Sequence, residues 1–317
     1  MTDSLAIGVD IGGTKVAAGV VGPDGVVQAR TVVPTPSHDS AAIEQAVVSA
    51  VRELSAEFPV VGVGIGAAGY IDAANGIVRY SPNTAWRDEP LRDRVAEQVG
   101  LPVRLENDGN VAAWGEYRFG AGRGARVMLL VAVGTGIGGG VVIEGALLRG
   151  ATGAAPELGH INLYPEGLRC GCGRLGCLEA YASGNSLGRY AREILEAEPE
   201  SSPSLLQLAG GSVGAVTGVH VTAAAQEGDR VALAAFDRVG LALGSGLADL
   251  AALFDPDVIV LGGGVSESGD LLRRPTELHF LEQRGQGGFD TTVRLVSAEL
   301  GNDAGLVGAA DLARLPS

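Results

Sequence analysis

The sequence predicts an α/β protein of two domains, and three observations support this prediction. The chain has 317 residues, which is enough for two domains of ordinary size. It contains 50 glycines and only 4% aromatic residues, a composition typical of α/β proteins with many tight turns between strands and helices. A pattern of three short strands joined by glycine-rich turns occurs twice, about 120 residues apart, and repetition at this distance indicates duplicated domains.

The first copy of the pattern lies near the start of the chain, in "LAIGVDIGGTKVAAGVVGPDGVVQARTVV". Its apolar runs predict strands over residues 5–9, 16–21 and 26–33, with "GGT" and "GPDG" as the two turns. Ser40 is then expected to cap a helix that runs to about Phe58, because apolar residues recur there at helical spacing. A buried strand, "VVGVGIGAAG", follows.

The second copy, over residues 127–150, reads "VMLLVAVGTGIGGGVVIEGALLRG". It again predicts three strands, here joined by a Gly-Thr-Gly turn and an "EG" hairpin turn. Asp229 is expected to cap a long helix that runs to about Phe254, before the strand "DVIVLGGGV" with its third glycine cluster. A last helix is expected over about residues 304–314. Facing copies of the glycine-rich turns would line a cleft with backbone N–H groups, which suits anionic oxygens.

Charge and hydropathy argue against two classes of function. The formal net charge is −14 and the isoelectric point about 4.7, whereas a nucleic-acid-binding surface needs clustered Lys and Arg. The N-terminal residues lack a basic segment followed by an apolar one, and no uninterrupted apolar run reaches about 18 residues. We therefore expect a cytoplasmic protein that binds neither nucleic acid nor a membrane.

All three cysteines lie in one short stretch, "GHINLYPEGLRCGCGRLGCLEAYAS". Their spacing from a histidine is H-x9-C-x-C-x4-C, and three thiolates with one imidazole make a complete tetrahedral set for structural Zn²⁺. Four protein ligands leave no open position for catalysis by the metal. The alternative is a reactive or buried thiol pair, which leaves the third cysteine and the histidine unexplained. The predicted ligands are His160, Cys170, Cys172 and Cys177.

Two further stretches suit ligand chemistry. "DIGGTK" is a candidate phosphate loop, because Asp10 at the strand end is a plausible partner of Mg²⁺-bound water and lies near Lys15, the sole lysine of the chain. It is not a Walker A motif, since a strand follows it instead of a helix. "ENDGN" sets carboxylates and amides after a short strand, where α/β proteins bind ligands, although an Asx turn capping a helix fits equally well. Glu157, Glu179 and Asn83 are isolated candidates for binding sugar hydroxyls, and the alternative for each is an ordinary cap or surface group.

Taken together, "DIGGTK", "ENDGN", "GTGIGGG" and "ELGHINLYPEGLRCGCGRLGCLEAYAS" resemble the ROK family (repressors, open reading frames, sugar kinases), and within it the bacterial ATP-dependent glucokinases. The last stretch resembles the ExGH and CxCGxxGCxE zinc signature of that family. The resemblance implies an actin-like (ribonuclease-H-like) ATPase fold with a duplicated βββα unit and an interdomain cleft. It also implies a smaller domain of residues 1–115 joined by the C-terminal helix, about residues 301–317, and a larger domain of residues 116–300.

The same resemblance implies an activity, the transfer of phosphate from Mg-ATP to the C6 hydroxyl of D-glucose. Asp108 would be the general base. The sugar would be held by Asn83, Asn107, Asp108, Glu157, His160 and Glu179. The nucleotide and its metal would be bound by Asp10, Gly12, Gly13, Thr14, Lys15, Thr135, Gly136, Gly262, Gly263 and Gly264. One structural zinc per chain would tie down the loop that carries Glu157 and Glu179, and the chain would form a homodimer or homotetramer.

Two alternatives stay open within the resemblance. Relatives that phosphorylate mannose, fructose, allose, N-acetylglucosamine or N-acetylmannosamine share these motifs, so another hexose or N-acetylhexosamine is the alternative substrate. The family also includes regulators that bind sugars without phosphorylating them; these carry an N-terminal helix-turn-helix, whereas the first strand here is expected at Leu5. Pro156, immediately before Glu157, departs from the family pattern and could stiffen the loop or shift the Glu157 carboxylate.

Overall fold

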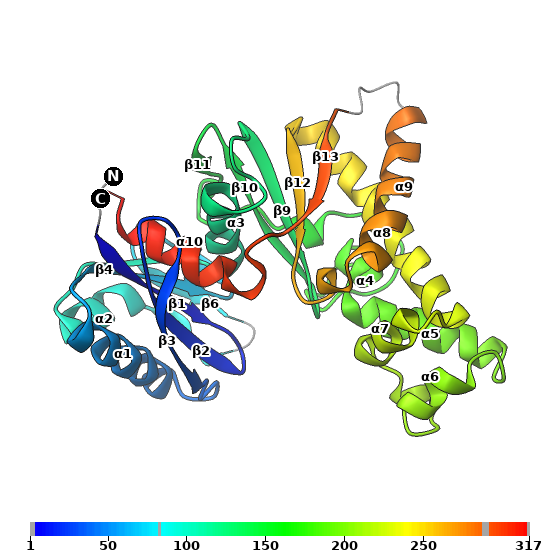
Figure 1. The fold of residues 1–317 in the computed structure, drawn as a ribbon, viewed down its shortest axis with the longest axis horizontal. Coiled ribbons are helices and arrows are strands. Elements are labelled where there is room, and N and C mark those ends of the chain that lie inside the picture. The colour runs from blue at the N-terminus through cyan, green and yellow to red at the C-terminus, as the bar shows by residue number, and fades with distance from the viewer. Residues whose placement is uncertain (1–3, 82–83, 287–291, 316–317) are drawn as a thin grey trace. The chain divides into compact units, whose positions relative to one another are not determined.

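The computed structural model of the chain describes residues 4–81, 84–286 and 292–315. The chain divides into two compact units. Unit 1 comprises Met1–Leu130, Gly139–Pro156 and Glu299–Ser317, and unit 2 comprises Val131–Gly138 and Glu157–Ala298. Both units contain strands and helices, which are labelled in Figure 1.

The first sheet has five strands in the order β3-β2-β1-β4-β8. Strands β1, β2 and β3 form an antiparallel meander, and β1, β4 and β8 run parallel. The first three strands confirm the sequence-based prediction, with ends that differ by one or two residues because local propensity defines strand ends poorly. The bounds are β1 Leu5–Ile11, β2 Lys15–Val21, β3 Val27–Pro34, β4 Val60–Ala67 and β8 Val103–Asn107.

Helices cover both faces of this sheet. On one face Ile7 and Val9 of β1 pack in one buried cluster with Ile43 and Val47 of α1, and on the other Ala6 packs with residues of α10, since alternate residues of a strand point to opposite faces. The N-cap of α1 is Asp39, whose carboxylate accepts hydrogen bonds from the backbone of Ala41 and Ala42; the predicted cap, Ser40, is one residue late. The helices are α1 Ser40–Glu57, α2 Leu91–Val99, α3 Asp108–Phe119 and α10 Ala304–Ala313.

Helix α10 touches the sheet and helix α3 through their backbones. A methyl group at Gly64 of β4 would lie 1.8 Å from the carbonyl oxygen of Ala309, and one at Gly308 would lie 1.8 Å from that of Val111 in α3. No side chain fits at either contact, so glycine is required there for close approach. The three elements are therefore packed more closely than a side chain at either glycine would allow.

A buried ionic cluster locks the end of α10 in place. The Asp311 carboxylate accepts hydrogen bonds from Trp114 Nε1 at 2.8 Å, from Arg118 Nε at 3.0 Å and from Arg314 Nη1 at 3.3 Å. Arg314 in turn donates to the backbone carbonyl of Ser4 at 2.9 Å and to that of Gly22 at 2.9 Å. The C-terminal helix is thus bonded to the beginning of β1 and to the turn after β2.

A small antiparallel sheet of three strands, in the order β5-β6-β7, also belongs to unit 1. Arg87 lies 4.3 Å from the centroid of the Tyr80 ring and donates to the carbonyl oxygens of Ser81 and Trp86. These bonds hold the two ends of the segment between β6 and β7. The strands are β5 Tyr70–Asp72, β6 Ile77–Tyr80 and β7 Arg87–Glu89.

The second large sheet repeats the topology of the first. Its order is β11-β10-β9-β12-β13, which matches β3-β2-β1-β4-β8 position by position and in chain order. The predicted duplication is therefore present, although the third strand of the second copy has only 2 residues. The bounds are β9 Val127–Val133, β10 Ile137–Ile143, β11 Ala146–Leu147, β12 Val258–Gly262 and β13 Arg294–Ser297.

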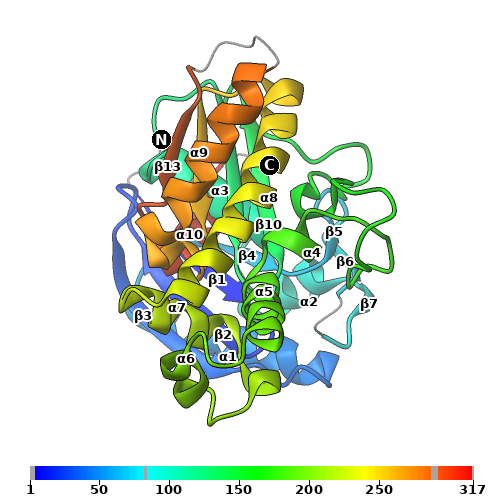
Figure 2. The ribbon, with the colours of Figure 1, turned by 90° about the vertical axis from the view of Figure 1, so that its right-hand side faces the viewer.

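Unit 2 carries most of the remaining helices. Asp229 caps α8, as predicted, by accepting hydrogen bonds from the backbone of Val231 and Ala232. Helix α8 is long and apolar enough to cross a membrane by length and composition alone, but 61% of its most apolar window is buried, and it packs along α9 (Figure 2). The helices are α4 Glu179–Ala182, α5 Gly184–Ala197, α6 Pro203–Leu208, α7 Gly218–Gln226, α8 Arg230–Phe254 and α9 Asp270–Gln286. Single 3₁₀ turns lie at Leu158–His160, Val213–Ala215, Ser266–Ser268 and Gly301–Asp303.

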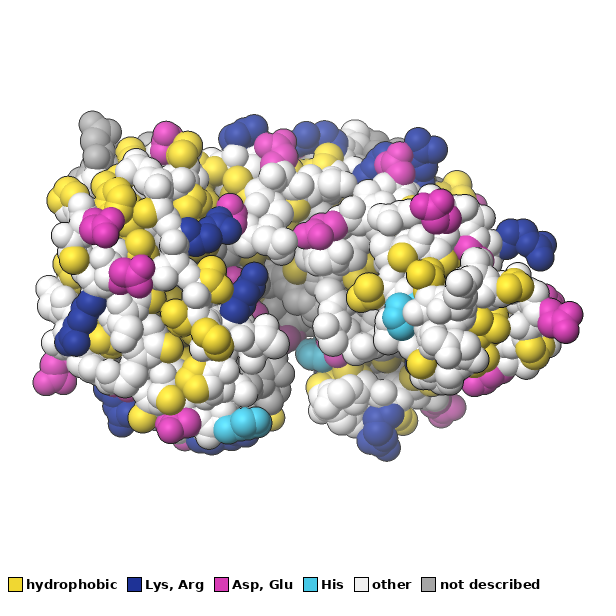
Figure 3. Space-filling view, turned by 60° about the horizontal axis from the view of Figure 1, so that its bottom comes forward, with side chains coloured by type: hydrophobic (Ala, Val, Ile, Leu, Met, Phe, Trp, Pro, Cys, Tyr) yellow, Lys and Arg dark blue, Asp and Glu magenta, His cyan; other side chains and the backbone are white. Residues whose placement is uncertain are grey.

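Charged side chains of both signs are interspersed on the face drawn in Figure 3. Basic side chains there alternate with acidic and apolar ones and do not gather in one patch.

Candidate active site and metal centre

The turn between β1 and β2 presents the second half of "DIGGTK" to solvent. Gly12 N donates to the carbonyl oxygen of Lys15 at 3.0 Å, which closes the turn. Thr35 holds it from the end of β3, because its backbone N donates to Thr14 O at 3.0 Å and its hydroxyl to Gly12 O at 2.8 Å. Gly13, Thr14 and Lys15 are exposed, so a ligand can reach a turn whose backbone is already fixed.

Asp10 is the penultimate residue of β1, and its carboxyl has a raised pKa. Burial and, to a smaller extent, the negative charge of Asp108 raise the pKa of its carboxyl to about 6, against the opposing positive charge of Lys15. The carboxyl lies against the first turn of α10, since a methyl group at Gly305 would be 3.4 Å from Asp10 Cγ. A carboxyl at a helix N-terminus next to a second carboxyl is well suited to a cation with bound water.

Asp108 is the first residue of α3, directly after β8. Asn107 caps the helix, because its Oδ1 accepts from Asn110 N at 3.1 Å, and its Nδ2 donates to Asp108 Oδ1 at 3.0 Å and to Gly69 O at 3.1 Å. The predicted alternative, an Asx-type helix cap, is thus present at Asn107 and leaves Asp108 accessible to solvent. Although Asp108 is accessible, the surrounding protein atoms desolvate it and raise its pKa.

Behind this loop lies a buried carboxylate, Glu106. Its Oε1 accepts from Asn107 N at 3.0 Å and from Asn110 Nδ2 at 3.0 Å, and its Oε2 pairs with Arg149 Nε at 2.6 Å. Arg149 is a residue that the sequence analysis missed, because nothing in the sequence distinguishes it from the other arginines. The pair holds the backbone of the motif that carries Asn107 and Asp108.

In unit 2 the Gly-Thr-Gly turn between β9 and β10 lies next to the third glycine cluster. Gly134 N donates to Gly136 O at 2.9 Å within the turn, and Val265 N donates to Val133 O at 2.9 Å from the loop after β12. A methyl group at Gly263, which has a φ of 82°, would lie 2.6 Å from Val133 O. The two predicted nucleotide-binding segments, Thr135 with Gly136 and Gly262 to Gly264, are therefore neighbours.

The predicted metal ligands come together in unit 2. The ligand atoms of His160, Cys170, Cys172 and Cys177 all lie within 4.8 Å of one another. Cys170 Sγ is 3.6 Å from His160 Nδ1, and Cys172 Sγ is 3.7 Å from Cys177 Sγ. Zinc bonds of about 2.3 Å to sulfur and about 2.0 Å to nitrogen at tetrahedral angles place a sulfur and a nitrogen ligand about 3.5 Å apart and two sulfur ligands about 3.8 Å apart. The four residues therefore fit a structural zinc site.

Both predicted sugar-binding carboxylates of this unit contact the cluster. His160 turns Nδ1 toward Cys170, which leaves Nε2 4.0 Å from Glu157 Oε2. Glu179 Oε1 accepts from Cys170 Sγ at 3.3 Å, and Glu179 Oε2 accepts from Ile137 N at 2.9 Å. Burial, together with Glu179, raises the pKa of the Cys170 thiol to about 12, so this thiol is held protonated where no cation stabilises its thiolate.

Two of the sequence-based observations need separate mention. The peptide bond before Pro156, the departure from the family pattern, is cis. Asn83 lies outside the described residues. The other predicted site residues divide between the two units. Those in unit 1 are Asp10, Gly12, Gly13, Thr14, Lys15, Asn107 and Asp108. Those in unit 2 are Thr135, Gly136, Glu157, His160, Cys170, Cys172, Cys177, Glu179, Gly262, Gly263 and Gly264.

Comparison with known proteins gives full-length matches. The sequence profile of the ROK family matches residues 6–315. A glucokinase of Streptomyces coelicolor is 47% identical over 312 residues, which cover 98% of this chain and 98% of that protein. A glucokinase of Thermotoga maritima is 39% identical over 311 residues, 96% of each chain. A solved structure of a ROK family glucokinase from Streptomyces griseus, in complex with glucose and AMPPNP, has a TM-score of 0.88 and 49% sequence identity, covering 98% of this chain and 99% of that one.

These matches extend over nearly all of both units. Together with the repeated strand order of the two large sheets, they confirm the predicted actin-like, ribonuclease-H-like ATPase fold.

The raised pKa of Asp10 predicts a pH-dependent stability in the ligand-free protein. A carboxyl with a pKa of about 6 in the folded state and 3.8 as its ordinary value adds stability below pH 3.8 that is lost as the pH rises through 6. Asp10→Asn removes this dependence. The free energy of unfolding of the variant minus that of the wild type should therefore fall by about 2 kcal/mol between pH 7.5 and pH 4.5.

Urea unfolding at several pH values measures this difference. Asp249→Asn, on the exposed side of α8, is the control and should show a nearly constant difference. A constant difference for Asp10→Asn as well would contradict the assignment.

The fit of the thiol cluster to zinc predicts that Cys172→Ser loses the metal and lowers the thermal unfolding midpoint together, because a structural zinc site contributes directly to folding free energy. Metal content by mass spectrometry should fall from about one zinc per chain to a small fraction of that. Gly171→Ala is the matched control, since a methyl group there meets no atom within 4 Å, and it should keep its zinc. A zinc-free Cys172→Ser with the wild-type midpoint would refute the structural role.

Proposed function

We propose that the chain, which belongs to the ROK family, is an ATP-dependent glucokinase that transfers the γ-phosphoryl group of Mg-ATP to the C6 hydroxyl of D-glucose. The observation that carries this proposal is likeness along the whole chain to proteins named glucokinase, one of them solved with glucose and a nucleotide analogue. The arrangement of the described side chains supports it, because each unit contributes groups of the kind that phosphoryl transfer requires.

Asp108 is proposed as the general base. It is accessible to solvent, it is held by Asn107, and desolvation raises its pKa, which strengthens it as an acceptor for the proton of the attacking hydroxyl. Asn83, Asn107, Glu157, His160 and Glu179 are proposed to hold the sugar hydroxyls.

Charge stabilisation is proposed to come from the glycine-rich turns and their neighbours. Asp10 would hold water bound to Mg²⁺, and Lys15 would supply positive charge in a chain whose net charge is −14. Backbone N–H groups of the segments around Gly12, Thr135 and Gly263 would bind phosphate oxygens. Zinc, when bound, supplies a structural cross-link and no reactive ligand position, since its four protein ligands complete a tetrahedron.

We further propose that the protein is cytoplasmic and forms a homodimer or homotetramer. The proposed domains are residues 1–115 with about 301–317, and residues 116–300. They differ from the compact units in assigning the end of α3, the start of β9, most of β10 and all of β11 to the larger domain.

Turnover across a panel of sugars tests the activity. ADP release from Mg-ATP is measured with glucose, mannose, fructose, N-acetylglucosamine and N-acetylmannosamine. Glucose is expected to give the highest kcat/KM, by about tenfold or more, because a pocket built to bond particular hydroxyls discriminates strongly against analogues that lack them. An N-acetylhexosamine in first place would replace glucose as the substrate. No ADP release with any sugar would contradict a kinase.

The role of Asp108 predicts that Asp108→Asn lowers kcat by about 10² to 10⁴, the usual contribution of a positioned general base. Glucose affinity, measured by calorimetry, should stay close to that of the wild type, because the amide keeps the size and most hydrogen bonds of the carboxylate. Asp24→Asn, in the turn before β3, is the control and should keep full turnover. Near-wild-type turnover of Asp108→Asn would remove this residue from the mechanism.

A further inference from the structure

The Gly-Thr-Gly turn of unit 2 is bonded at both ends to the segment that carries Glu179. At one end Ile137 N donates to Glu179 Oε2 at 2.9 Å. At the other end Gly184 N donates to Gly134 O at 2.8 Å. Residues 157–179, which contain the predicted metal ligands, are called the zinc loop here. Glu179 ends this loop and begins α4, and Gly184 begins α5, so the turn is bonded both to the zinc loop and to the start of the helix that follows it.

Steric contacts reinforce these bonds. A methyl group at Gly136 would lie 2.2 Å from Glu179 Oε2, and a methyl group at Gly159, beside the ligand His160, would lie 2.3 Å from Ile137 O. The turn is therefore in van der Waals contact with the zinc loop from two directions. In the metal-free protein the other carboxylate oxygen of Glu179 also accepts from Cys170 Sγ at 3.3 Å; when Cys170 binds zinc as a thiolate this bond is lost, and the bond from Ile137 N holds the carboxylate.

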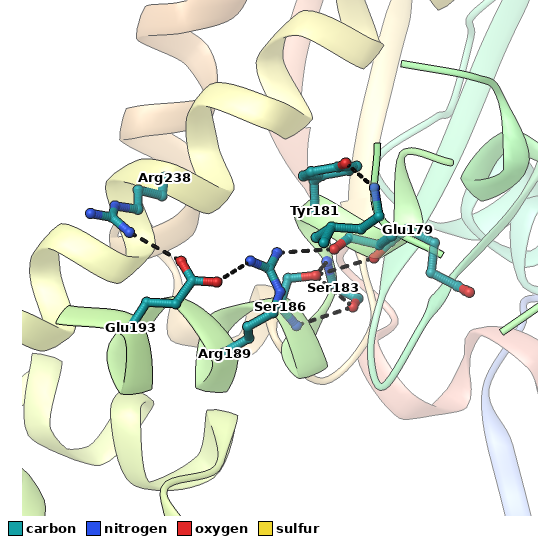
Figure 4. A network of polar contacts seen from close by, with 9 residues as sticks. Glu179, Tyr181, Ser183, Ser186, Arg189, Glu193 and Arg238 are labelled. Carbon is teal, nitrogen blue, oxygen red and sulfur yellow. Dashed lines mark hydrogen bonds and ion pairs between the residues drawn. The ribbon is translucent and has the colours of Figure 1, made fainter. Parts of the chain in front are cut away.

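Glu179 is itself held from behind by a polar network (Figure 4). Ser186 Oγ donates to the Glu179 carbonyl oxygen at 3.2 Å, and Arg189 donates to that of the next residue, Ala180, at 3.1 Å. Arg189 is in turn paired with Glu193 at 2.6 Å. With its backbone fixed in this way, the Glu179 side chain points away from α5 toward the turn.

We propose that Glu179 is a positioning residue for the nucleotide-binding turn, in addition to its proposed contact with the sugar. Its carboxylate sets the backbone of Gly134 to Ile137, and with it the direction of the N–H groups that meet phosphate. The inference rests on the proposed function, since it assumes that Thr135 and Gly136 bind nucleotide. One side chain then connects the sugar-binding loop to the phosphate-binding turn, and nucleotide affinity depends on a residue of the sugar site even when no sugar is present.

Nucleotide binding in the absence of sugar tests this role, because a residue that only contacts sugar leaves it unchanged. Calorimetric titration with Mg-AMPPNP is expected to show about tenfold or more weaker binding for Glu179→Ala, the usual effect of losing a hydrogen bond to a charged group. Glu179→Gln keeps an oxygen that can accept from Ile137 N and should stay within about threefold of the wild type. Glu166→Ala, which removes an exposed carboxylate of the same loop, should leave affinity unchanged.

A second pair of variants tests the contact in the ligand-free protein. Gly136→Ala should lower the thermal unfolding midpoint, because its methyl group collides with the carboxylate. In Gly136→Ala/Glu179→Ala the space is vacated, so the double variant should be more stable than the sum of the two single effects indicates. If the change in the unfolding midpoint of the double variant equals the sum of the changes in the two single variants, the proposed contact between Gly136 and Glu179 is wrong.

The two proposals fail in different ways. A wild-type protein that binds no Mg-AMPPNP overturns the proposed function and the inference with it. If the wild type binds Mg-AMPPNP and Glu179→Ala binds it equally tightly, the inference is overturned and the proposed function stands.

Discussion

The placement of the unit 1 site depends on one constraint, the backbone contact of α10 with the first sheet and with α3. Glycine at positions 64 and 308 removes the side chains that would otherwise separate these elements. Because α10 begins beside Asp10 and α3 begins with Asp108, the same contact sets where both carboxyls lie. Close packing of helices tolerates little displacement. It therefore holds the Asp10 and Asp108 carboxyls more firmly in place than loops alone would.

One buried carboxylate and one half-buried carboxylate perform a similar task at a shorter range. Glu106 joins the motif of Asn107 and Asp108 to Arg149, and Glu179 joins a turn of unit 2 to the zinc loop. In both cases the carboxylate accepts from a backbone N–H group, so a charge that costs free energy to bury is used to orient the main chain. The positions of the ligand-binding backbone therefore depend on side chains that need not touch the reacting atoms.

The elements of the fold were largely predictable because their signals are local. The first three strands, the cap of α8 at Asp229 and the duplicated pattern all follow from residues close together in the chain. The cap of α1 was misplaced by one residue because Asp39 and Ser40 are both good capping residues, and only the geometry decides between them. The small sheet β5-β6-β7 was not predicted, since its strands have no more than 4 residues each and little alternation.

The candidate site was predictable where its residues are unusual and not where they are common. The only three cysteines in a chain of 317 residues lie close together and so predict a metal site. The sole lysine likewise marks the predicted phosphate loop. Arg149 is one of many arginines, and its partner Glu106 lies far from it in the sequence. The bond between Glu179 and Ile137 likewise joins residues 42 positions apart, so no local pattern could reveal it.

The late position of α10 in the chain has a consequence for synthesis on the ribosome. The first sheet is complete once β8 has emerged, but the helix that covers one of its faces follows nearly two hundred residues later. Until then Gly64 and the apolar residues around it have no partner, and the salt-bridged cluster at Asp311 does not exist. Unit 1 is therefore expected to finish folding only after unit 2 and α10 have been made, so that the carboxyls of its site are assembled late in synthesis.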